Sequence, residues 1–159
     1  MKGLIEHRQK SRTNDIGELA DIGIRYLQEG EYALAYLCLD QSRKSDLCTL
    51  YNKALCCYRI EWFTACYNLL CEAERQLTAV PSTYIGDLPE AFVRWEHEKN
   101  TIFSPMPYGT PSSVATVQLL KLKAATAIKL NLCSEAQSIH YGLGNKYRYI
   151  NELLKDIKP

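Results

Sequence analysis

The stretch "YLQEGEYALAYLCLD", Tyr26 to Asp40, decides the fold because it places a Gly-Glu step between two apolar runs with helical spacing. Gly30 is the residue type that most often ends a helix, since glycine adopts left-handed backbone angles without strain. The next apolar run begins at Tyr32 and continues at helical spacing through Ala35 and Leu39. Two helices joined by so short a turn form an antiparallel hairpin.

The same pattern recurs along the chain. When the frame is shifted so that Leu19 falls on Leu50, this hairpin aligns with a second one, and a further shift onto Leu120 aligns it with a third. Small residues are kept at two positions, which are occupied by Gly23, Ala54 and Ala124 and by Ala35, Cys66 and Ala136. Small side chains there let neighbouring helices approach closely. At the seven positions compared, only His140, in the place of Leu39, departs from the apolar or small class. Two further positions are kept less well: Ile22 aligns with Lys53 and Lys123, and Gly30 aligns with Glu61 and Asn131.

The segment "LADIGIRYLQEGEYALAYLCLDQS", Leu19 to Ser42, resembles a tetratricopeptide repeat, and "LYNKALCCYRIEWFTACYNLLCEA" and "LLKLKAATAIKLNLCSEAQSIHYGL" resemble more degenerate copies. The chain departs from the family in lacking a closing proline after Ser42 and Leu143. Its first repeat spacing, from Leu19 to Leu50, is also shorter than that of the family. The resemblance implies an all-α fold of antiparallel helical hairpins, stacked as a right-handed solenoid.

A chain of 159 residues is long enough for one domain with a substantial core. We expect an N-terminal tail over residues 1–14 and a single domain over residues 15–159. The expected parts of that domain are repeats at about 16–45, 47–77 and 114–144, a proline-rich insertion at 78–113 with a short helix in 87–99, and a C-terminal capping helix at 145–158.

The resemblance also implies a binding surface, because peptides in this family usually lie along the face made by the first helix of each hairpin. The corresponding residues are Ala20, Ile24, Leu27 and Gln28, then Tyr51, Asn52, Leu55, Tyr58 and Arg59, and finally Lys121, Ala125, Ile128 and Lys129. They would form an apolar, aromatic groove with a basic end, suited to a helix or an extended segment. Two kinds of occupant are left open: a partner, or the insertion or final helix of this chain.

Composition excludes several partner classes. With a net charge of +1 the chain has no bulk field to attract nucleic acid or an anionic membrane. The N-terminus carries charges where a secretory signal needs an apolar core, and the longest uncharged stretch, residues 100–120, contains three prolines. We therefore expect a soluble, cytoplasmic protein whose seven cysteines are reduced and packed as small hydrophobes.

No pattern in the sequence points to catalysis, a cofactor or a metal. The cysteines lack C-x-x-C spacing, and neither His97 nor His140 is accompanied by a nucleophile motif or a phosphate-binding loop. The sequence therefore predicts a non-catalytic adaptor or scaffold that binds a protein or peptide. The alternative is a small cytosolic chaperone similar to the three-repeat chaperones of type III secretion, and self-association through the groove is a further possibility.

Overall fold

In a computed structural model of the chain, residues 17–77, 103–145 and 147–157 are described. These residues form helices and turns without a strand, which confirms the predicted all-α class for this part of the chain. The predicted tail and the helix expected at 87–99 lie outside the described residues. The helices cover residues 17–28, α2 (Tyr32–Gln41), α3 (Leu47–Arg59), α4 (Phe63–Arg75), α6 (Ser112–Lys129), α7 (Cys133–Gly142) and α8 (Arg148–Lys155).

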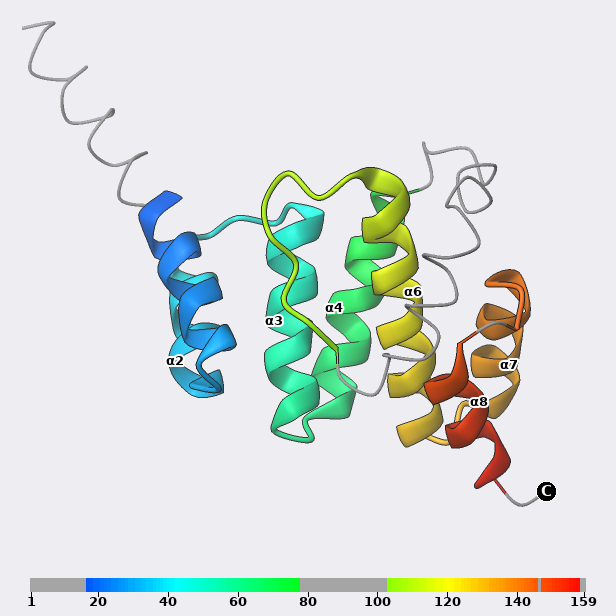
Figure 1. The fold of residues 1–159 in the computed structure, drawn as a ribbon. Coiled ribbons are helices and arrows are strands. Elements are labelled where there is room, and N and C mark those ends of the chain that lie inside the picture. The colour runs from blue at the N-terminus through cyan, green and yellow to red at the C-terminus, as the bar shows by residue number, and fades with distance from the viewer. Residues whose placement is uncertain (1–16, 78–102, 146, 158–159) are drawn as a thin grey trace, which may run out of the picture.

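The helices stand in a row that follows the order of the chain. Figure 1 shows them side by side from α2 at one end to α7 at the other, with α8 at the α7 end. The packing agrees with this order, because α2 contacts α3, α3 contacts α4, α4 contacts α6, and α6 contacts α7. The final helix, α8, packs against both α6 and α7.

Three turns between helices have the same geometry. Gly30, Glu61 and Asn131 occupy equivalent positions and all have left-handed backbone angles, with φ of 81°, 64° and 62°. The residue after each of them donates its backbone N–H to a carbonyl five residues back, at 2.8–2.9 Å: Glu31 to Tyr26, Trp62 to Cys57, and Leu132 to Ala127. This is the Schellman arrangement, which satisfies carbonyls left unpaired at the end of a helix. The recurrence predicted from the sequence therefore extends to the backbone of the turns.

The second turn gives a stability prediction. A residue with a Cβ is strained at the positive φ of Glu61, whereas glycine is not. Glu61→Gly should therefore raise the free energy of unfolding by about 1 kcal/mol, measured by urea denaturation. Glu61→Ala is the matched control, because it removes the carboxylate but keeps the Cβ, and it should not reproduce the gain. An equal gain from both substitutions would show that the charge, rather than the backbone angle, limits stability.

Small residues set the spacing of the helices. A Cβ added to Gly23 would lie 2.8 Å from Leu39 Cγ, inside the contact distance of two carbons, so the first helix and α2 are as close as a glycine allows. Ala54 and Ala124 at the equivalent positions are fully buried, as is Cys66 of α4. Burial raises the pKa of the Cys66 thiol to about 12, so this side chain is a neutral, small hydrophobe at physiological pH.

Candidate functional site

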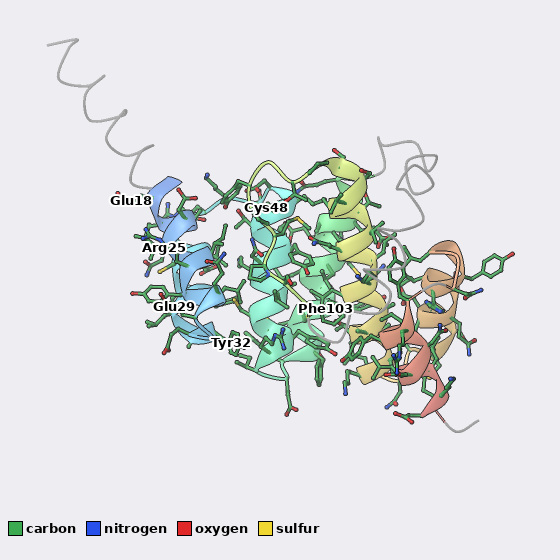
Figure 2. The ribbon with its side chains drawn as sticks, viewed as in Figure 1. Glu18, Arg25, Glu29, Tyr32, Cys48 and Phe103 are labelled. Atoms are coloured by element: carbon green, nitrogen blue, oxygen red, sulfur yellow. The ribbon has the colours of Figure 1, made fainter. Side chains whose placement is uncertain are left out.

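The part of the insertion nearest to α6 lies across the face of α3. Residues 103–111, here called the strap, run as an elongated, non-helical segment along α3 before the chain enters α6 (Figure 1). Figure 2 labels Cys48 near the start of α3 and Phe103, the first residue of the strap. The strap therefore occupies the face on which the sequence predicted a groove.

Asn52 of α3 binds the backbone of Met106 at the centre of the strap. The Asn52 side-chain amide donates to the Met106 carbonyl at 2.8 Å, and its oxygen accepts the Met106 backbone N–H at 2.8 Å. The Cys48 thiol donates to the same carbonyl at 2.9 Å. Asn52 is fully buried and Met106 is 1% exposed, so these groups have exchanged water for one another.

Two longer side chains of α3 hold the rest of the strap. The Tyr51 hydroxyl donates to the Ser104 carbonyl at 3.1 Å, and Arg59 donates to the Phe103 carbonyl at 2.8 Å. Together with Cys48 and Asn52 these residues form what we call the strap site. All four bind main-chain atoms of the strap and none binds a strap side chain in these hydrogen bonds.

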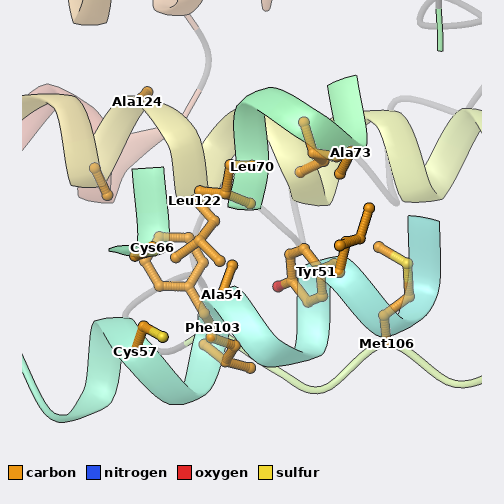
Figure 3. Close-up of a cluster of buried hydrophobic side chains, with 14 of the residues drawn as sticks. Tyr51, Ala54, Cys57, Cys66, Leu70, Ala73, Phe103, Met106, Leu122 and Ala124 are labelled. Carbon is orange, nitrogen blue, oxygen red and sulfur yellow. The ribbon is translucent and has the colours of Figure 1, made fainter. Parts of the chain in front are cut away.

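Two apolar strap side chains are buried against the helices. Met106 and Phe103 belong to the same cluster of buried side chains as Tyr51 and Ala54 (Figure 3). The Phe103 ring also packs edge-on against Tyr58 of α3, with ring centroids 5.5 Å apart. Aromatic pairs of this geometry add to the energy of area burial. The strap is thus fixed by its backbone, by these two apolar side chains and by Tyr108, whose hydroxyl is hydrogen-bonded to Thr49 of α3 at 2.7 Å.

The final helix joins the same aromatic cluster. Tyr149 of α8 packs edge-on against Phe103 at 5.5 Å, and its hydroxyl forms a 3.1 Å hydrogen bond with the hydroxyl of Tyr58. Burial and this hydrogen bond raise the pKa of Tyr58. Just before α8, the Tyr147 ring lies 4.6 Å from the Lys121 ammonium of α6. α8 therefore covers the α6 end of the face, next to the strap.

Most of the residues predicted to line the groove are buried in the structure. Among them Tyr58 and Arg59 are half-buried, whereas Gln28 and Lys129 are exposed. The buried ones are Ala20, Ile24, Leu27, Tyr51, Asn52, Leu55, Lys121, Ala125 and Ile128. Of the two occupants left open by the sequence, the described residues show the chain's own insertion and final helix on this face. Binding of a partner there stays a prediction.

Part of the face stays open between the strap and the first hairpin. A cleft of about 440 Å³ lies between the end of the helix 17–28, α3 and the strap. Its walls include Leu27, Gln28, Tyr32, Leu55, Arg59 and Phe103. The cleft therefore combines apolar surface with a guanidinium and an amide, directly beside the strap site.

The sequence left open that the insertion fills the groove, but it did not identify residues 103–111 as the part that does so. One signal was present: "FSPMPYGTP" places an aromatic residue and a methionine three positions apart among prolines. Proline favours an elongated backbone and restricts the residue before it in the same direction. Nothing local in the sequence shows which helix such a segment binds.

An ionic cluster joins the second hairpin to the third. The Lys123 ammonium of α6 forms ion pairs with Glu74 of α4 and, at 3.3 Å, with Glu135 of α7, and the Tyr67 hydroxyl donates to Glu135. The hydrogen bond from Tyr67 and the pairing with Lys123 outweigh burial and lower the pKa of Glu135. Burial alone would lower the pKa of Lys123, but the two carboxylates outweigh it and raise that pKa.

These shifts predict a pH dependence of stability. Because the folded-state pKa of Glu135 is lowered, its contribution is present above the unfolded pKa of about 4.3 and is lost as pH falls through the folded value. We therefore expect Glu135→Gln to destabilise the chain at pH 7, and to differ from wild type less at pH 3, by urea denaturation. Glu152→Gln is the control, because its pair with Arg148 is exposed on both sides. A constant effect of Glu135→Gln across this range would contradict the assigned cause.

His140 has a structural position in this fold. It is 3% exposed in α7, and its Nε2 forms a 2.7 Å hydrogen bond with the Asn151 side chain of α8. The sequence has a polar residue here where the first hairpin has Leu39. That polar side chain makes the contact that fixes the final helix.

Among the described residues, no group of three or more His, Cys, Asp or Glu side chains is arranged to hold a metal ion. None of the helices in the described ranges combines the length and the apolar character needed to cross a membrane. Comparison of the chain with protein-family models, with curated proteins and with solved structures finds no match.

Proposed function

We propose that this chain is a non-catalytic protein-binding module, built from tetratricopeptide-like repeats, and that the face of α3 on which the strap lies binds a polypeptide segment of another protein. The observation that carries the proposal is the reciprocal pair of hydrogen bonds between Asn52 and the backbone of Met106. A buried side-chain amide that pairs with both polar groups of one residue is a means of holding an elongated backbone. The face thus already holds a polypeptide segment, which is the activity proposed for it toward a partner.

The repeat assignment is supported by the turns and by the small residues. The three Schellman turns fall at the positions that the sequence alignment makes equivalent. A fully buried small residue of the next helix follows each turn, namely Ala35, Cys66 and Ala136. Such regular stacking of hairpins exposes one extended face to partners. We therefore propose a solenoid of three hairpins, with α8 as its C-terminal cap.

The open cleft is the place where a partner first contacts this face. It needs no rearrangement of the chain, and its volume of about 440 Å³ accommodates several side chains of a bound segment. Gln28, the last residue of the helix 17–28, is exposed and lines this cleft.

The test compares two substitutions on one helix. Gln28→Trp narrows the cleft, whereas Arg25→Trp adds the same side chain at another exposed position, one that does not line the cleft and is on the outer side of the first hairpin in Figure 2. Affinity capture from host lysate with quantitative mass spectrometry should show partners that bind to wild type and to Arg25→Trp, and are at least tenfold depleted with Gln28→Trp. Partners retained equally by all three proteins would place binding elsewhere and contradict the proposal.

A further inference from the structure

We propose that the strap is a displaceable internal ligand, and that the strap site takes from a partner protein an elongated segment of the same kind: an aromatic residue followed three positions later by a methionine between prolines. This inference rests on the proposed function and adds to it the chemistry of the bound segment and the competitor it displaces.

The contacts of the strap are those of a bound peptide rather than of a core element. The hydrogen bonds from the strap site reach only main-chain atoms of residues 103, 104 and 106, so any chain with the same backbone path satisfies them. Selectivity therefore comes mainly from the two buried side chains, Phe103 and Met106, with a smaller part from the Tyr108 hydroxyl, which is hydrogen-bonded to Thr49. Ser104 and Pro107 are exposed, so these positions of a bound segment are free to vary.

The prolines explain why only one strap N–H needs a partner near the centre. Pro105 and Pro107 flank Met106 and carry no backbone N–H, so the Met106 N–H is the single donor between them, and Asn52 accepts it. Prolines also fix the backbone before binding, which reduces the entropy lost when a segment is held in one conformation. A partner segment with prolines at these two positions would bind for the same reasons.

When a partner segment displaces the strap, it makes contacts of the same kind with the strap site. A partner segment with this pattern replaces the hydrogen bonds to the strap site and the two buried apolar contacts that the strap gives up. The strap competes from within the same chain, so the apparent affinity for the partner is the intrinsic affinity multiplied by the fraction of molecules with a vacant site. Weakening the strap without changing the strap site should therefore increase the affinity for an added segment.

The test uses the full chain and a fluorescein-labelled peptide with the sequence of residues 103–110, "FSPMPYGT". Met106→Ala removes the most buried strap side chain and leaves the strap site unchanged. Fluorescence anisotropy should show at least about tenfold tighter binding to Met106→Ala than to wild type. The same peptide with its methionine replaced by aspartate should not bind either protein. Tyr108→Phe, which removes only the 2.7 Å hydrogen bond between Tyr108 and Thr49, should give a smaller increase.

Cys48 provides a second readout, independent of the label. Its thiol donates to the Met106 carbonyl, and burial together with the nearby Asp46 raises its pKa to about 12, so the bound strap suppresses its reactivity. Alkylation of Cys48, followed by mass spectrometry, should be faster in Met106→Ala than in wild type and should slow again when the peptide is added. The buried Cys56, Cys57 and Cys66 should stay unmodified, which reports that the fold is intact.

Each remaining outcome contradicts the inference. If the peptide binds Met106→Ala and Tyr108→Phe no more tightly than wild type, the strap is a fixed part of the fold. If wild type is a dimer by light scattering and Met106→Ala is a monomer, the site takes the strap of a second copy instead of a partner. The peptide test can fail while Gln28→Trp still depletes captured partners. In that case the proposed function stands, because the Gln28→Trp experiment depends on the cleft and not on displacement of the strap.

Discussion

Replacing Asn52 with leucine should lower the free energy of unfolding by about 3 kcal/mol, although the two side chains have similar volumes. The substitution leaves the Met106 backbone N–H without its acceptor in a position with almost no access to water. It also removes one of the two donors to the Met106 carbonyl, so that only the weaker Cys48 thiol remains. An unpaired buried polar group costs about 1–3 kcal/mol, and here two groups are affected to different degrees.

Urea denaturation measures the change, and Asn68→Leu is the matched control. Asn68 is exposed on α4, so the same substitution there should change the free energy of unfolding by no more than about 0.5 kcal/mol. Asn52→Leu should also speed alkylation of Cys48, because the strap loses its central hydrogen bonds. Equal effects of the two substitutions would mean that the Asn52–Met106 contact contributes little to the fold.

Tyr51→Ala should lower the free energy of unfolding by about 3–5 kcal/mol. Tyr51 is the largest fully buried side chain of the described residues, at 1% exposure, and its removal leaves a cavity between α3 and the strap. Tyr51 was predicted to line a groove, and alanine substitution would have been the natural probe of partner binding. Its burial means that this substitution would disrupt the fold and the binding surface together.

Tyr51→Phe separates the two contributions. It keeps the ring and removes the hydroxyl that donates to the Ser104 carbonyl, so we expect a loss of about 1 kcal/mol. Urea denaturation of both variants measures the difference, which we assign to packing of the ring. A loss with Tyr51→Phe as large as that with Tyr51→Ala would show instead that the hydrogen bond dominates.

The helices were predictable because their signals are local. Gly30 and the apolar spacing on either side of it indicate a hairpin, and the small residues that recur with it indicate where the helices approach each other. The turn after α3 could be placed only by alignment, since Glu61 is not a residue that ordinarily ends a helix in this way. The repeat alignment therefore located this turn, which the preference of glutamate for such a position would not have done.

The sequence named the insertion and the final helix as possible occupants of the groove but could not choose between them and a partner, because the contacts that decide this are not local. Asn52 and Met106 are 54 residues apart, and nothing in the neighbourhood of either residue marks the other as its partner. The same holds for Tyr58 and Tyr149, which are 91 residues apart. The residues of the face were identified from the spacing within hairpins, whereas what covers them depends on contacts between distant parts of the chain.

The strap also has a consequence for the cooperativity of unfolding. In a simple repeat array each hairpin contacts only its neighbours, so that the array can lose hairpins from its ends one at a time. Here the strap binds α3 and leads directly into α6, while Tyr149 of α8 contacts Tyr58 and Phe103. These contacts bypass α4 and link the second hairpin, the third hairpin and α8, so α3, α4, α6, α7 and α8 should open as one unit in native-state hydrogen exchange. Among the labelled helices α2 contacts only α3, so we expect α2 to open more readily than the helices that the strap and Tyr149 link.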